Sequence, residues 1–249
     1  MIEIDTIYNE DCLVGMQRIP DGTVDAIITD LPYGTTDCDF DAVIPFEPLW
    51  AEYRRIIKPK GNILLFASGR FMFDLYASQP DLYRYDLIWK KSKCGSPFTA
   101  KYMPMKKHEH ILVFGHSGAT YNPQLVYGNP PYSRNWTPNK HNNHKYGITG
   151  TEHHNDGTRQ PSTILDFPQK WRRQDQLHPT QKPVELLRWL VRSFSDTDSL
   201  ILDSCIGSGT TAVAALMEHR HFIGFETDKG YYDKAVERIA DLRRNPTLF

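Results

Sequence analysis

The sequence predicts an α/β fold, in which a mostly parallel β-sheet carries helices on both faces. Short apolar segments typical of strands alternate with amphipathic segments typical of helices almost throughout the chain. The composition is 40% apolar and 24% charged, which is typical of a globular protein with a sizeable core. The length of 249 residues suits one domain, or one domain that carries an insertion.

The first half of the chain predicts four strands and one helix. Residues 24–29 form a β-branched apolar run between turn residues, so we expect a buried strand there. Over residues 46–58 the apolar side chains recur at helical spacing, and Pro59 and Gly61 end that helix. Further apolar runs predict strands at 62–67, 87–89 and 110–114.

The second half repeats the alternation. Pro183 suits the first turn of a helix, and one apolar face follows it as far as Phe194. Residues 200–203 predict a strand that runs directly into a glycine-rich turn. A helix over 211–218, a strand over 221–226 and a last amphipathic helix complete the prediction.

The interval 116–176 interrupts this alternation. It is rich in Asn, His, Pro, Tyr and Gly, and a loop of this length is uncommon in a compact domain unless it has a function. Its aromatic residues interleave with basic ones, a mixture suited to phosphates and base edges. We therefore expect an inserted recognition region at 116–176, between catalytic segments at 1–115 and 177–249.

Charge and cysteine content restrict the class of protein. The net charge is −1, yet residues 90–107 hold six lysines and no acid, which is typical of a site for phosphates. No apolar run is long enough to span a bilayer, and the first residues lack the features of a signal peptide. The four cysteines are scattered, which favours a reducing compartment. These features predict a cytoplasmic protein.

Histidine pairs raise the alternative of a metal site. His108 and His110 form an H-x-H pair, and His153 and His154 are adjacent. Neither pair has a nearby cysteine or carboxylate partner at the spacing of a zinc site. We interpret these histidines as surface or hydrogen-bonded side chains and expect no metal.

A glycine-rich turn is the first candidate site. Residues 203–211 read Asp-Ser-Cys-Ile-Gly-Ser-Gly-Thr-Thr and join a predicted strand to a predicted helix. Glycines allow close approach of the backbone to a ligand, and the helix N-terminus offers N–H groups. Glu226 ends the next strand, where a carboxylate can accept both hydroxyls of a ribose. The pattern Gly207-x-Gly209-x-x-Ala212 also fits an NAD site, so a nucleoside-bearing ligand is predicted without a choice of cofactor.

Asp30-Leu31-Pro32-Tyr33 is the second candidate site, at the end of the strand predicted over 24–29. The ends of parallel strands are where open α/β folds bind ligands. The Asp30 carboxylate and the Leu31 carbonyl can accept both hydrogens of an exocyclic amino group. Tyr33 can stack on the heterocycle that bears this group.

Together these motifs resemble the amino-group DNA methyltransferases. Asp30-Leu31-Pro32-Tyr33 is similar to their Asp-Pro-Pro-Tyr motif, and residues 203–211 are similar to their S-adenosylmethionine loop. The catalytic motif precedes the cofactor loop, as in the permuted β class. Other matches are Asp11-Cys12, Trp89-Lys90 with the segment 107–112, and His178-Pro179-Thr180-Gln181-Lys182-Pro183. Leu31 departs from the pattern by replacing a proline, and Ser204-Cys205 replace Pro-Phe.

The resemblance implies a Rossmann-like S-adenosylmethionine-dependent methyltransferase fold with an inserted target-recognition region at 116–176. It implies that Asp30, Leu31, Pro32 and Tyr33 receive the target base, Glu226 the ribose and Asp11 the adenine of the cofactor. Lys182 and Thr180 are implied to lie near the cofactor's carboxylate. The full set of cofactor-binding residues implied is Asp11, Cys12, Thr180, Lys182, Asp203, Ser204, Cys205, Gly207, Ser208, Gly209, Thr210, Thr211 and Glu226.

The function implied is site-specific methylation of adenine N6 in double-stranded DNA, with S-adenosyl-L-methionine as cofactor. The resemblance also implies that the protein acts in a prokaryote or a phage-infected host. Asp at position 30 favours adenine, whereas Ser there would favour cytosine N4. A homodimer and a cognate restriction endonuclease are the further partners considered. Two alternatives stay open: an NAD-dependent oxidoreductase, which leaves Asp30 to Tyr33 unexplained, and a DNA-binding module without activity, which the intact Asp30 and Tyr33 disfavour.

Overall fold

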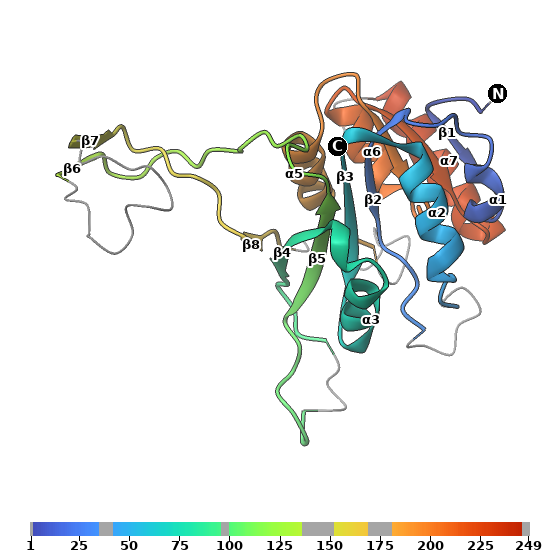
Figure 1. Cartoon of the computed structure of the whole chain (residues 1–249), viewed down its shortest axis with the longest axis horizontal. Coiled ribbons are helices and arrows are strands. Elements are labelled where there is room, and N and C mark those ends of the chain that lie inside the picture. The colour runs from blue at the N-terminus through green and yellow to red at the C-terminus, as the bar shows by residue number, and fades with distance from the viewer. Residues whose placement is uncertain (1, 35–41, 96–99, 136–151, 169–180, 246–249) are drawn as a thin grey trace. The chain divides into compact units, whose positions relative to one another are not determined.

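A computed structural model describes residues 2–34, 42–95, 100–135, 152–168 and 181–245 (Figure 1). The chain divides into two compact units, of which the larger comprises residues 1–122 and 163–249 and the smaller residues 123–162. In the described parts of the chain, no helix is both long and apolar enough to cross a membrane.

The larger unit is built on an eight-stranded sheet with the order β1-β10-β9-β2-β3-β5-β4-β8. Its strands are β1 (Thr6–Tyr8), β2 (Val24–Thr29), β3 (Ile57–Ala67), β4 (Tyr83–Lys90), β5 (His108–Gly115), β8 (Ile164–Asp166), β9 (Leu200–Asp203) and β10 (His221–Phe225). Every neighbouring pair is parallel except those that β5 makes with β3 and β4. The predicted α/β fold with a mostly parallel sheet is therefore confirmed.

Helices cover both faces of this sheet, as Figure 1 shows. They are α1 (Cys12–Met16), α2 (Phe46–Ile56), α3 (Arg70–Ser78), α5 (Val184–Phe194), α6 (Thr210–Met217) and α7 (Lys229–Arg244). Side chains of α5, α6 and α7 pack in one apolar cluster and those of α1, α2 and α3 in a second. Along β2, Ala26 and Ile28 belong to the first cluster and Ile27 to the second, because successive side chains of a strand point to opposite faces.

The elements predicted from apolar runs are present, with small differences in their ends. The expected helix over 46–58 ends at Ile56, because β3 already begins at Ile57. Pro183 is the residue before α5 rather than within its first turn. The sequence analysis missed β1, α1, α3 and the short strands within the interval 116–176. The first two are only three and five residues long, too short to show a periodic pattern.

The smaller unit contains a two-stranded antiparallel sheet of β6 (Tyr132–Asn135) and β7 (Glu152–Asn155). It spans residues 123–162 and is narrower than the insertion expected at 116–176. The difference arises because β8, inside the expected insertion, pairs with β4 in the larger sheet. Asn122 likewise belongs to the larger unit, where its side chain amide donates to the Ser195 carbonyl.

The parallel strands place the motif residues along one edge of the larger sheet. Asp11 follows β1, Glu226 follows β10, the glycine-rich turn follows β9 and Asp30 follows β2. Since these strands are neighbours in the sheet, their carboxyl ends meet at a common edge. The direction of β5 is opposite, so its first residues His108 and Glu109 lie at this same edge.

Candidate active site

The ends of β2 and β9 bring the two main motifs together. Ala26 pairs with Ile201 and Ile27 with Leu202, so Asp30 and Ser204 follow adjacent strands. Thr29 Oγ1 donates a hydrogen bond of 2.6 Å to Asp203 Oδ1. The motif that begins at Asp30 and the glycine-rich turn are therefore neighbours, although 173 positions separate Asp30 from Asp203.

The glycine-rich turn has the backbone conformation that its sequence predicts. Gly207 and Gly209 have φ values of 52° and 77°, in the left-handed region that other residues rarely adopt. A Cβ atom at Gly209 would also lie 3.1 Å from the Cβ of Ala235 on α7. Gly209 precedes α6, so the N-terminus of that helix and its N–H groups follow the turn directly.

Glu226 lies against this turn. Its Oε2 accepts a hydrogen bond of 2.9 Å from the Gly207 amide, and its Oε1 accepts one of 2.8 Å from the Asp228 amide. Burial raises the pKa of Glu226, and these backbone hydrogen bonds limit the rise. The two bonds fix the carboxylate beside the turn, and each oxygen retains a lone pair for a further donor.

Asp203 is almost fully buried beneath the same turn, at 4% exposure. Its Oδ1 accepts from Thr29 and, at 3.1 Å, from the Cys205 amide, and Thr211 is a further hydrogen-bond partner. Burial raises the pKa of Asp203 to about 6, against the effect of these hydrogen bonds. Through these hydrogen bonds Asp203 connects the turn to Thr29 at the end of β2 and to Thr211 in α6.

The other predicted residues of the turn are also held by the protein. The Ser204 hydroxyl lies 2.6 Å from the hydroxyl of Tyr53 on α2, and Ser208 and Thr210 are buried. Arg238 on α7 donates hydrogen bonds of 3.0 Å to both the Ser208 carbonyl and the Thr210 hydroxyl. Burial lowers the pKa of Arg238 to about 10. The sequence analysis missed Arg238, since an arginine on an amphipathic helix resembles a solvent-exposed residue.

Asp11 and Cys12 lie at the start of α1. Asp11 precedes the helix, and its Oδ1 accepts a hydrogen bond of 2.7 Å from the Leu13 amide. The Cys12 side chain is buried and lies in hydrogen-bond contact with that of Cys205. This contact and burial raise the pKa of the Cys205 thiol well above its ordinary value, so the Cys205 thiol stays protonated at neutral pH. The segments 11–12 and 203–209 thus meet through these cysteines.

The motif from Asp30 to Tyr33 forms a compact turn. The Tyr33 hydroxyl donates a hydrogen bond of 2.8 Å to Asp30 Oδ1, and the Leu31 side chain is buried. The Tyr33 ring stacks on Phe71 of α3, with ring centres 4.9 Å apart and an angle of 28° between the rings. Phe71 therefore sets the plane of the Tyr33 ring. The sequence analysis missed this role because α3 was not predicted.

Lys182 contacts Asp30 directly. Its ammonium donates to Asp30 Oδ2 and lies 3.5 Å from Glu109 Oε2. Burial lowers the pKa of Lys182, but the charges of Asp30 and Glu109 outweigh it and the pKa is raised overall. Thr180, the other residue implied near the cofactor's carboxylate, lies outside the described residues. The structure therefore links Lys182 to the motif from Asp30 to Tyr33, at the end of the sheet where the glycine-rich turn also lies.

Glu109 is a buried carboxylate that the sequence analysis did not select. Burial raises its pKa, whereas the ammonium groups of Lys182 and Lys91 lower it, and the net shift is downward. The available signal was an acid next to the apolar run of β5, inside the segment that matched the family pattern.

Among the described residues, no group of three His, Cys, Asp or Glu side chains could hold a metal ion.

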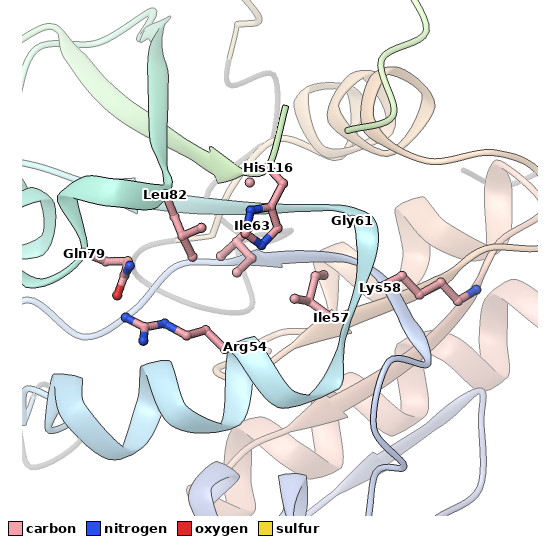
Figure 2. A pocket seen from close by; sticks show the side chains of 9 residues that line it. Arg54, Ile57, Lys58, Gly61, Ile63, Gln79, Leu82 and His116 are labelled. Carbon is pink, nitrogen blue, oxygen red and sulfur yellow. The ribbon is translucent and has the colours of Figure 1, made fainter. Parts of the chain in front are cut away.

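A separate cavity of about 260 Å³ lies at the opposite edge of the sheet (Figure 2). Its lining comes from α2, the first half of β3, the segment before β4 and the end of β5, and consists of Arg54, Ile57, Lys58, Gly61, Ile63, Gln79, Leu82, Gly115 and His116. Because β3 runs away from this edge toward Ala67, the cavity is remote from Asp30. The candidate site is thus defined by the convergence of the motifs and not by this hollow.

Comparisons with known proteins agree with this geometry. The family model described as DNA methylase matches residues 24–237. The DNA adenine methyltransferase YhdJ of Escherichia coli (strain K12) is 26% identical over 261 residues, which cover 95% of this chain and 83% of that protein. The type II methyltransferase M.HpaI of Haemophilus parainfluenzae is 27% identical over 244 residues, which cover 92% of this chain and 72% of that protein.

Two solved structures share the fold. The M1.HpyAVI-SAM complex has a TM-score of 0.61 at 24% identity, covering 94% of this chain and 98% of that chain. The cytosine-N4-specific PvuII DNA methyltransferase has a TM-score of 0.66 at 16% identity, covering 96% of this chain and 91% of that chain. The similarity extends over nearly the whole length of both structures.

Proposed function

The chain belongs to the DNA methylase family, with S-adenosylmethionine as cofactor, and we propose that it methylates adenine at N6. The observation that carries the proposal is the convergence of Asp30 and the glycine-rich turn at adjacent strand ends, joined by the bond from Thr29 to Asp203. An acceptor for an amino group and a nucleoside site are thereby neighbours. An NAD-dependent oxidoreductase does not account for the family match or for Asp30 beside the turn.

The residues at this edge fit S-adenosylmethionine. Glu226 offers carboxylate oxygens to a ribose diol, and Asp11 offers a carboxylate to an adenine amino group. Gly207 and Gly209 permit close approach of the backbone to the methionine part, for which the N-terminus of α6 supplies N–H groups. When bound, the cofactor supplies an electrophilic sulfonium methyl group. The remaining candidates of the loop, from Asp203 to Thr211, act through the shape of the turn that they maintain.

Asp30 and its neighbours act on the target base. A base in a duplex is stacked, so the nucleotide must turn out at a cost of roughly a few kcal/mol, part of which stacking on Tyr33 recovers. Asp30 and the Leu31 carbonyl accept the two hydrogens of the exocyclic amino group and stabilise the positive charge that develops on nitrogen. A carbon–nitrogen bond forms as the carbon–sulfur bond breaks, and the extra amino proton then leaves. Positioning supplies most of the acceleration.

Contact with double-stranded DNA is supported by the connection between β4 and β5. This connection starts and ends at the edge of the sheet where Asp30 lies, because β4 is antiparallel to β5. Lys93, Lys101 and Lys107 are exposed on it, and Tyr102 and Met103 are 88% and 59% exposed. Ammonium groups bind phosphates, and exposed apolar side chains can occupy space between bases. We propose that this connection contacts DNA beside the flipped nucleotide.

The choice of adenine rests on Asp30 and on the similarity to the E. coli adenine enzyme. The test is expression in a bacterial host that lacks DNA methylation, followed by modification-sensitive sequencing and mass spectrometry of the nucleosides. N6-methyladenine at one sequence context is expected. N4-methylcytosine would overturn the proposed base, and the absence of both modified bases would overturn the proposed activity.

The smaller unit, residues 123–162, is the proposed target-recognition region, and the catalytic segments flank it. A homodimer and a cognate restriction endonuclease are the proposed partners. The support for the endonuclease is the similarity to type II methyltransferases such as M.HpaI. Sedimentation of the purified protein tests the dimer. An assay for restriction activity in an extract of the organism from which the protein comes tests the endonuclease. Similarity to bacterial enzymes also supports the proposed cytoplasmic location.

A further inference from the structure

Both carboxylate oxygens of Asp30 already have partners at the edge of the sheet. Oδ1 accepts from the Tyr33 hydroxyl and Oδ2 accepts from the Lys182 ammonium. Lys182 is 8% exposed, and its ammonium lies 4.9 Å from the centre of the Phe66 ring. An aspartate held by two donors in this way has one orientation before any base arrives. The position of the Lys182 ammonium therefore decides where the acceptor oxygens of Asp30 point.

Glu109 is the second anion that contacts Lys182. It comes from β5, whereas Asp30 follows β2, and the end of β3 separates the two strands in the sheet. Lys182 lies between the two carboxylates, bonded to Asp30 and 3.5 Å from Glu109 Oε2. Lys91 pairs with the other oxygen of Glu109. Asp30, Lys182, Glu109 and Lys91 thus form a row of alternating charges.

Glu109 retains an unused acceptor within this row. Its Oε2 is buried and accepts no hydrogen bond from the described residues, although the Lys182 ammonium is within ion-pair distance. A lysine carries three N–H donors, so Lys182 can serve both carboxylates at once. A buried carboxylate with an unfilled oxygen is costly unless nearby cations compensate it. Here the compensation comes from Lys182 and Lys91.

We propose that Glu109 is a positioning residue of the methyl transfer, which holds the Lys182 ammonium against Asp30. Glu109 itself touches neither base nor cofactor in this proposal. It keeps Lys182 charged in a buried place and thereby keeps the Asp30 carboxylate in the orientation that accepts the amino group. The proposal rests on the proposed function of Asp30, and it deepens that function by naming what orients the acceptor.

The test replaces Glu109 by the isosteric Gln, with Asp86→Asn as the matched control. Asp86 lies on β4 and pairs with His110 at 2.7 Å, so the control also removes one carboxylate charge from this part of the sheet, but not one that contacts Lys182. For E109Q we expect kcat to fall roughly 10- to 100-fold, with little change in the Kd for S-adenosylmethionine and in the KM for DNA. For D86N we expect kcat within about twofold of the wild type.

The pH profile separates positioning from a general loss of structure. The titratable groups around Lys182 and Glu109 are Asp30, Lys91, Lys106 and His108. In the wild type, the carboxylates of Asp30 and Glu109 both oppose the effect of burial, which lowers the pKa of Lys182. In E109Q only Asp30 opposes it, so the pKa of Lys182 should be lower than in the wild type. We therefore expect E109Q to lose activity at alkaline pH where the wild type and D86N keep it. An E109Q enzyme with the kcat and the pH profile of the wild type would overturn the proposal.

A measurement that needs no catalytic turnover tests the positioning role independently of the proposed activity. The pKa of Lys182 can be followed by NMR of protein labelled at the lysine Cε carbons, with Lys182→Arg to assign the signal. A lower pKa in E109Q than in the wild type and D86N is expected, and an identical pKa would overturn the proposal even if no DNA is methylated. Should E109Q not fold, Glu109→Asp replaces it: the charge stays but the carboxylate is withdrawn, and an unchanged kcat would contradict the positioning role.

Discussion

Thr29 Oγ1 donates a hydrogen bond of 2.6 Å to Asp203 Oδ1, although the two residues are 174 positions apart in the sequence. Thr29 is the last residue of β2 and Asp203 the last of β9, so this bond joins the two strand ends that carry the main motifs. The next residue along β2 is Asp30, and the turn after Asp203 leads to Gly207 and Gly209. Transfer between a cofactor and a base requires this neighbourhood.

Removing the Asp30 carboxylate should abolish most of the catalysis. We expect Asp30→Ala to lower kcat by about 10²- to 10³-fold, because the charge that develops on the amino nitrogen loses its acceptor. The Kd for S-adenosylmethionine should change little, since Glu226 and the turn are intact. Transfer of labelled methyl groups to DNA measures the first quantity and calorimetry the second. Transfer at the rate of the wild type would exclude Asp30 from the reaction.

Glu226→Ala should weaken binding of the cofactor. A hydrogen bond to a charged group contributes about 1.5–3 kcal/mol, so we expect the Kd for S-adenosylmethionine to rise roughly 10- to 100-fold. The amides of Gly207 and Asp228 also lose their acceptor, and Glu226→Gln is the control because it keeps one acceptor oxygen. Calorimetric titration gives both constants. An alanine variant that binds as tightly as the wild type would remove Glu226 from the cofactor site.

Asp203→Asn should make the protein more stable at neutral pH. The pKa of Asp203 is about 6 in the folded protein, above the ordinary value of 3.8. The folded state therefore keeps this proton between about pH 4 and pH 6, whereas the unfolded chain loses it. The contribution of Asp203 to stability is greatest below pH 4 and is lost as the pH rises through 6.

The size of this loss is at most about 3 kcal/mol, at 1.36 kcal/mol for each pKa unit. The asparagine variant does not titrate, so its free energy of unfolding should rise relative to the wild type between about pH 4 and pH 6 and stay higher above that range. Urea unfolding of both proteins at a series of pH values measures the difference. A difference that does not change with pH would contradict the raised pKa.

Arg238→Met should destabilise the glycine-rich turn, because it removes the hydrogen bonds that Arg238 donates to Ser208 and Thr210. The substitution leaves the Ser208 carbonyl without its donor, and an unsatisfied buried acceptor costs about 1–3 kcal/mol. We expect a lower melting temperature and a several-fold higher Kd for S-adenosylmethionine. Arg243→Met is the matched control on the same helix, because Arg243 is exposed and, within the described part of the chain, donates to the Asp5 carbonyl at the surface. Equal effects of the two substitutions would argue against a specific role for Arg238.

Exchange of residues 123–162 should change the sequence that is methylated. This segment is a compact unit of its own, so a relative's corresponding segment can replace it without altering the sheet that carries Asp30. We expect a new methylated context with a similar kcat on its own target. Sequencing of methylated sites in a host that expresses the hybrid reads the result. Methylation of the original context by the hybrid would exclude this segment as the recognition region.

Local patterns in the sequence predicted much of the fold. Each pattern used for these predictions lies within a short stretch of sequence: the apolar run over 24–29, the helical spacing over 46–58 and the glycines at 207 and 209. Such patterns specify the type of an element and its approximate position in the sequence, wherever the element lies in the fold. The antiparallel direction of β5 and the pairing of β8 with β4 do not follow from local patterns, since they depend on how distant segments meet.

The sequence by itself determined that a carboxylate ends one strand, that a glycine-rich turn ends another and that Glu226 ends a third. The order of strands in the sheet decided which of these ends became neighbours. Only the tertiary structure paired Lys182 with Asp30 and Glu109 and brought Arg238 beneath the turn. The physical reason is that buried charged groups pair with whichever groups lie close to them in space. For residues on separate strands and helices, the local sequence does not show which of them will lie close together.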